Sequence, residues 1–77
     1  LGRGSNKVDF DTTVRIRKEI SAAKSMSVYA RNVQIITTKG RVTLRGPVNS
    51  AEEKRLIGDI AANIAGKENV DNHLEVK

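Results

Sequence analysis

The segment GRVTLRGPVNSAEE, residues 40–53, decides the fold because it contains a turn, a strand and the start of a helix in direct succession. Its first residue, Gly40, follows Lys39 and supplies the positive φ angle that a tight hairpin needs. Its last four residues form a capping box, in which the Ser50 hydroxyl and the Glu53 carboxylate satisfy backbone N–H groups at the start of a helix. The segment therefore predicts a hairpin followed by a helix.

Strands are expected on both sides of this hairpin. Residues 33–38 alternate with a period of two, which is typical of a strand with one buried face. Residues 41–45 repeat the alternation and direct Val42 and Leu44 inward. Gly46-Pro47 is expected to end this second strand.

A first helix is expected before the strands. It covers about residues 12–25, with Asp11 as the N-cap and with Ile16 and Ile20 on one apolar face. The segment 25–32 shows neither helical nor strand periodicity. We interpret it as a connecting loop.

A second helix and a third strand complete the pattern. The helix starts at Ser50 and is expected to end at Gly66, which suits a left-handed C-cap. Its apolar residues recur with helical spacing: Leu56, Ile57, Ile60, Ala61 and Ile64. Residues 70–76 alternate again, with Val70, Asn72, Leu74 and Val76 on one side.

This order of elements predicts an α+β fold, a two-layer αββαβ sandwich. The helical crossover makes the last strand parallel to the second, so the three-stranded sheet is mixed and both helices cover one face. Residues 1–8 are expected to be a disordered linker or an expression remnant, because they are polar, rich in glycine and without the apolar stretch of a signal peptide. The domain is expected to span residues 9–77.

The composition excludes several classes of protein. A chain of 77 residues is long enough for one small core, and with 3% aromatic residues that core must be aliphatic. There is no cysteine and a single histidine, His73, so the sequence indicates no metal site. No spacing of polar residues indicates catalysis or a cofactor, and no apolar run is long enough to span a bilayer. A non-enzymatic domain is expected.

The net charge of +5 is unevenly distributed, since residues 1–46 hold the excess of lysine and arginine whereas residues 47–77 are net acidic. The basic part is a candidate surface for an anionic partner, although a basic surface can also serve solubility alone. Ile36 and Tyr29 are the apolar candidates, each with the alternative of exposure without function or of packing. The candidate binding residues are Lys18, Lys24, Tyr29, Arg31, Ile36, Arg41 and Arg45.

The order and spacing of short motifs resemble the BON family, the bacterial OsmY and nodulation domain, over about residues 9–77. The motifs are Asn32-Val33, Gly40, the run from Val42 to Val48, the capping box from Ser50 to Glu53, and Gly66 with Val70, Asn72, Leu74 and Val76. The resemblance implies an αββαβ domain without catalytic residues. It also implies a periplasmic or outer-membrane protein.

These observations predict a module that binds anionic phospholipid or a membrane surface, with a possible link to osmotic or envelope stress implied by the resemblance. The alternative is a protein or cell-wall interaction module that docks another domain of the same protein. A nucleic-acid-binding domain is the third interpretation, which the lack of stacking aromatic residues disfavours.

Overall fold

The computed structural model describes residues 7–23 and 27–77. Its elements are α1 (Lys7–Ala22), α2 (Val28–Arg31), β1 (Gln34–Thr38), β2 (Arg41–Val48), α3 (Ala51–Ala65), the 3₁₀ turn η1 (Lys67–Asn69) and β3 (Val70–Val76). The first six residues of the expected linker, and Lys24 among the expected binding residues, lie outside the described part.

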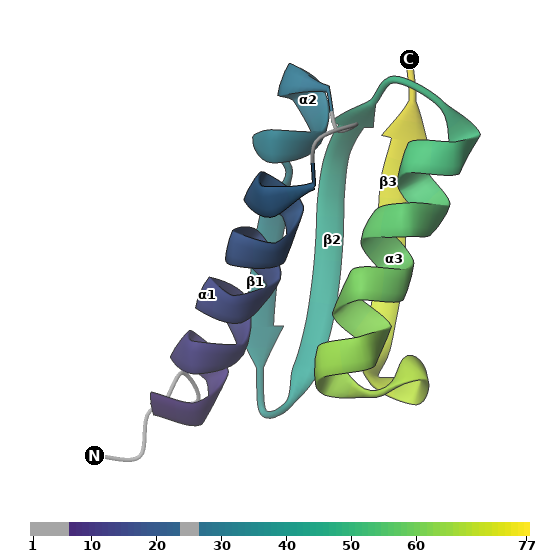
Figure 1. Cartoon of the computed structure of the whole chain (residues 1–77). Helices are drawn as coiled ribbons and strands as arrows, with labels where there is room; N and C mark the ends of the chain where they lie inside the picture. Colours follow the sequence, from purple (N-terminus) through teal and green to yellow (C-terminus); the bar gives the residue numbers. More distant parts are fainter. Residues whose placement is uncertain (1–6, 24–26) are drawn as a thin grey trace.

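The expected α+β sandwich is confirmed. The sheet has the order β1-β2-β3, with β1 antiparallel to β2 and β2 parallel to β3. Figure 1 shows α1 and α3 side by side over one face of the sheet, with α2 at the end of the molecule where β3 finishes. Within the described part of the chain, no helix lies on the opposite face of the sheet.

The core between the layers is aliphatic and contains the inward residues expected of the first two strands, whereas Val76 of β3, expected on the inward side, is 48% exposed. Its fully buried large side chains come from every layer: Ile16, Ile20, Val33, Val42, Leu44, Val48, Ile57 and Leu74. Each such side chain contributes roughly 1.5–3 kcal/mol of burial free energy before chain entropy is subtracted. The outward positions of β1 are exposed, so the predicted period of two is confirmed there.

The start of the first helix differs from the expectation. α1 begins at Lys7, so Asp11 lies inside the helix and is exposed rather than serving as the N-cap. The residue that matters near this end is Asp9, whose buried carboxylate accepts hydrogen bonds from the N–H groups of Lys39 and Gly40 at 2.8 and 3.0 Å. Asp9 thereby ties α1 to the hairpin turn.

The second strand and the expected loop also differ. β2 continues through Pro47 to Val48, because its pairing with β1 ends at Arg45 while the pairing with β3 goes on. Pro47 therefore lies where no N–H is needed on the β1 side. Part of the expected loop is the short helix α2, which Ser27 caps by accepting a hydrogen bond from the N–H of Ala30 at 3.2 Å.

Two glycines set the geometry of the hairpin, for different reasons. Gly40 follows Lys39 in a turn where both residues have positive φ, which the twist of the flanking strands favours. Gly46 has φ near 128°, and a Cβ atom there would approach the Cα of Val33 at 3.4 Å. That distance is ordinary van der Waals contact, so the positive φ angle, rather than the spacing from Val33, favours glycine at position 46.

Alanine substitutions separate these two effects. Gly46→Ala is expected to lower the free energy of unfolding by about 2–3 kcal/mol, since residues with a side chain rarely adopt a φ angle near 128°. Gly40→Ala, which has open space around its Cβ, is expected to cost only about 1 kcal/mol. Urea denaturation measures both values, and an equal or larger loss for Gly40→Ala would contradict this account.

Candidate functional site

The carboxylate of Glu53 joins three segments at one end of the domain. Its Oε2 accepts a hydrogen bond from the N–H of Ser27 at 2.7 Å. Its Oε1 accepts from the Ser27 hydroxyl at 2.9 Å and from the N–H of Asn49 at 2.8 Å. The start of α2, the β2–α3 turn and the first turn of α3 therefore share one buried anion.

The capping box at the start of α3 is thus only partly as expected. Ser50 does cap the helix, because its hydroxyl accepts a hydrogen bond from the N–H of Glu53 at 3.2 Å. The Glu53 carboxylate, however, accepts a hydrogen bond from the N–H of Asn49 rather than from that of Ser50. The remaining acceptor capacity is directed across the molecule to Ser27, which local sequence patterns do not show.

The hydrogen bonds decide the ionisation of this carboxylate. Burial alone would raise the pKa of Glu53, but the N–H groups of Asn49 and Ser27 and the Ser27 hydroxyl outweigh it and hold the pKa below its ordinary value. Glu53 is therefore ionised at neutral pH. Its negative charge is satisfied by fixed donors.

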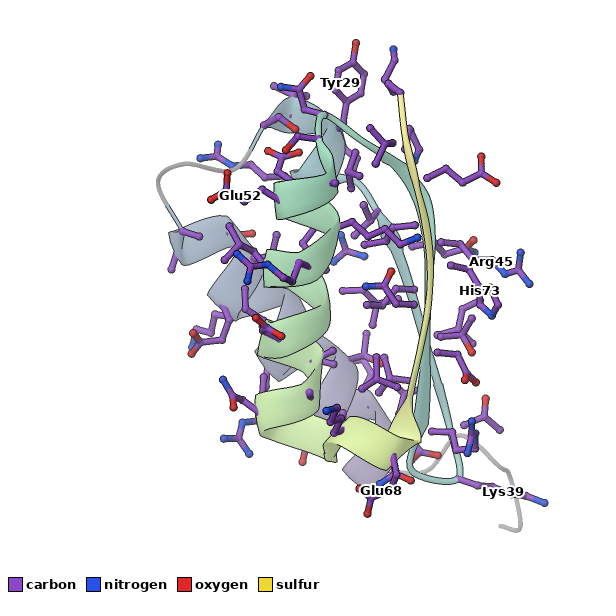
Figure 2. All side chains as sticks on the ribbon, turned by 90° about the vertical axis from the view of Figure 1, so that its right-hand side faces the viewer. Tyr29, Lys39, Arg45, Glu52, Glu68 and His73 are labelled. Carbon is purple, nitrogen blue, oxygen red and sulfur yellow. The ribbon has the colours of Figure 1, made fainter. Side chains whose placement is uncertain are left out.

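This anion holds α2 in a position that exposes apolar side chains. Ala30 is fully buried, whereas Val28 is 71% and Tyr29 is 42% exposed. Figure 2 shows Tyr29 projecting from the end of the molecule. A four-residue helix has little stability of its own, so its orientation depends on the Ser27 contacts.

Cations surround these apolar side chains. Lys77 places its Nζ 4.1 Å from the centre of the Tyr29 ring and 3.1 Å from the Tyr29 hydroxyl. The Arg17 guanidinium donates to the backbone carbonyl of Arg31 at 3.0 Å, which brings the Arg17 side chain to the end of α2. We call the set Arg17, Val28, Tyr29, Arg31 and Lys77 the α2 tip.

The face of the sheet away from the helices, called the open sheet face, contains other candidate residues. Here the positive charge of Arg41 is offset by a carboxylate. Arg41 forms an ion pair with Asp71 at 2.9 Å, the single ion pair within the described residues. Its guanidinium donates a hydrogen bond that lowers the pKa of the Asp71 carboxyl. Arg45 lies beside His73 in the register of β2 and β3, and Figure 2 shows both on this face.

The sequence-predicted binding residues therefore do not form one patch. Tyr29 and Arg31 belong to the α2 tip, whereas Ile36, Arg41 and Arg45 lie on the open face of the sheet. Lys18 is exposed on α1. Sequence analysis missed Arg17 and Lys77, since only the fold brings their side chains to α2. It also left out Val28, although this residue is next to Tyr29 in the chain.

Two usual signs of a site for a small polar ligand are absent from the described residues. They include no group of histidine, cysteine or carboxylate side chains arranged to hold a metal ion. The one hollow described, lined by Asn49, Ser50, Glu52, Glu53 and Leu56, surrounds the start of α3. No buried side-chain nitrogen or oxygen in this part of the chain lacks a hydrogen-bond partner, so none is left over to receive a ligand.

The family is decided by a comparison with models of protein families, in which the BON domain matches residues 8–77. The chain belongs to the BON domain family. BON domains are non-catalytic binding domains of periplasmic and other envelope proteins, and the family is associated with phospholipid and membrane binding. A comparison with curated proteins gave no match.

Membership in the BON domain family directs attention to surfaces that can meet a membrane from outside. Across residues 7–23 and 27–77, each helix is too short or too polar to cross a bilayer. The two surfaces that contain candidate residues are the α2 tip and the open sheet face. They differ in charge balance and in exposed apolar area.

Replacing Glu53 tests its role in this BON domain. Glu53→Gln substitutes an N–H₂ group for an oxygen that faces N–H or O–H donors, and we expect a loss of about 2–3 kcal/mol in the free energy of unfolding at neutral pH. Glu52→Gln, which changes an exposed neighbour by the same chemistry, should change it by less than about 0.5 kcal/mol. Chemical denaturation monitored by circular dichroism provides both values.

The pH dependence gives an independent check. Because the pKa of Glu53 is lowered in the folded state, its contribution is present above the ordinary glutamate pKa of about 4.3 and is lost as pH falls through the folded value. The difference in stability between the native chain and Glu53→Gln should therefore shrink as pH falls below about 4. A difference that stays constant from neutral to strongly acidic pH would contradict this role.

Proposed function

We propose that this BON domain binds membranes that contain anionic phospholipid, and that it does so through the α2 tip. The observation that carries the proposal is the exposure of Val28 and Tyr29 on a short helix whose neighbours are Arg17, Arg31 and Lys77. An aromatic ring with a polar hydroxyl suits the boundary between headgroups and acyl chains. The cations suit the headgroup phosphates.

The open sheet face is a weaker candidate for the same task. The charge of Arg41 is offset by Asp71, and Glu75 lies on the same strand as Asp71 and points the same way by alternation. Ile36 is exposed there, but without an unbalanced cluster of cations around it. Lipid headgroups carry negative charge, so the charge balance favours the α2 tip.

The expected affinity is modest. Each cation near an anionic surface contributes on the order of 1 kcal/mol, so Arg17, Arg31 and Lys77 together supply about 3 kcal/mol before salt screening. Burial of Val28 adds a further increment of roughly 1–2 kcal/mol. Such a sum corresponds to reversible association, and a protein that holds several copies of the module would bind more tightly through avidity.

We place this binding in the periplasm or at the outer membrane, which the occurrence of BON domains in envelope proteins supports. A response to osmotic or envelope stress is part of the same proposal. The alternative function, docking of another domain of the same protein, would use the same exposed apolar side chains and would leave the domain indifferent to vesicles.

Two arginine variants test the assignment to the α2 tip. Arg31→Gln and Arg45→Gln remove the same charge, one from the α2 tip and the other from the open sheet face. In sedimentation with vesicles of increasing anionic lipid content, Arg31→Gln should weaken binding about fivefold and Arg45→Gln less than about twofold. Binding of the native chain should fall as salt rises.

The other outcomes are equally informative. Equal losses in the two variants would mean diffuse charge attraction without a defined site. A larger loss for Arg45→Gln would move the binding surface to the sheet. Failure of the native chain to bind any vesicle composition would refute the proposed function.

A further inference from the structure

The two edges of the sheet differ in how they are protected. β3 forms one edge and carries the charges of Asp71 and Glu75 on its outward face. β1 forms the other edge with the sequence QIITT, which contains no charge and no proline. Exposed strand edges are normally protected against pairing by such residues. The outer edge of β1, which pairs with no other strand among residues 7–23 and 27–77, is therefore a candidate interface.

Exposed apolar side chains of α1 lie beside this same edge. The hydroxyl of Thr13 contacts that of Thr37 on β1 at 2.7 Å, which fixes the side of α1 that faces the strand. Phe10 and Val14 are one helical turn apart, so they share a side of α1 next to Thr13, and they are 65% and 43% exposed. They therefore flank β1 on its free side.

The charges along α1 match an antiparallel copy of themselves. Asp11 lies toward the beginning of the helix and Lys18 lies about two turns later, and both are exposed. In an antiparallel pair related by a twofold axis near Val14, Asp11 of one copy comes opposite Lys18 of the other. Opposite charges at opposite ends of one surface are what a self-complementary interface requires.

From these observations we propose that two copies of this chain pair through their β1 edges in antiparallel orientation. The two three-stranded sheets then form one continuous six-stranded sheet across a twofold axis. Phe10 and Val14 of the two copies cover the junction on the helix side, and Ile36, which is 40% exposed, covers it on the open side. The interface does not use Val28, Tyr29 or Lys77 of the α2 tip.

The strand itself favours a second copy over an unrelated strand. Across a twofold axis, uncharged and β-branched residues of β1 meet uncharged and β-branched residues, so no like charges oppose each other. The same axis satisfies the backbone N–H and C=O groups of both free edges. It also pairs Asp11 with Lys18 twice.

The test is the mass of the chain in solution as a function of concentration. Sedimentation equilibrium from about 10 µM to about 1 mM covers the Kd values of small interfaces. The native chain should change from the mass of one copy to that of two. Ile36→Lys, which adds a charge to the β1 edge, should keep the mass of one copy, while Val76→Lys makes the same kind of change on β3 and should dimerise as the native chain does.

A charge exchange tests the antiparallel arrangement. Asp11→Lys should weaken dimerisation at least fivefold, and the double variant Asp11→Lys with Lys18→Asp should restore it. Amide resonances that shift with concentration should belong to β1 and to the Phe10 side of α1. Circular dichroism checks that each variant is folded.

Three results would overturn the proposal. The first is a native chain that stays at the mass of one copy throughout. The second is dimerisation that Ile36→Lys leaves intact. The third is a set of concentration-dependent amide shifts at the α2 tip instead of β1.

Discussion

One buried carboxylate, that of Glu53, determines how the end of this domain that contains α2 is arranged. An isolated anion inside a protein is costly, and it is tolerated here because donors from Ser27 and Asn49 are fixed around it. The hydrogen bonds to this carboxylate also hold the backbone of Ser27 and Asn49 in place. The short helix α2 therefore has a fixed position although it is too short to be stable alone. This position in turn fixes where Val28 and Tyr29 are exposed.

The layers of the fold could be predicted from sequence because they rest on periodicity and local capping. The alternation in residues 33–38 and 41–45 is a local signal that predicts the buried face of each strand. The cap at Ser50 is a local signal that predicts where the helix starts. Contacts across the chain give no such signal. Asp9 contacts the Lys39-Gly40 turn, and Glu53 contacts Ser27, across about thirty residues of sequence. From the sequence alone, each carboxylate could equally be a helix cap or a surface charge.

The candidate site was harder to predict for the same reason. Tyr29 and Arg31 are neighbours in sequence, but Arg17 and Lys77 reach them only through the packing of α1 and the position of β3. Conversely, Arg41 has no partner that the sequence alone would indicate. The parallel register of β2 and β3 brings Asp71 beside it, and the two form an ion pair. Strand register is a tertiary property, and charge counting along the chain cannot supply it.

The contact between Asp9 and the hairpin turn also has a kinetic consequence. The N–H groups that donate hydrogen bonds to Asp9 are in place only once the turn has formed. Bringing Asp9 to this turn closes a loop of about thirty residues, which costs chain entropy. Docking of α1 should thus be a late step in folding. The same helix should be the first to detach during transient opening of the native state, so its amide protons would exchange with solvent sooner than those of β2, which lies at the centre of the sheet.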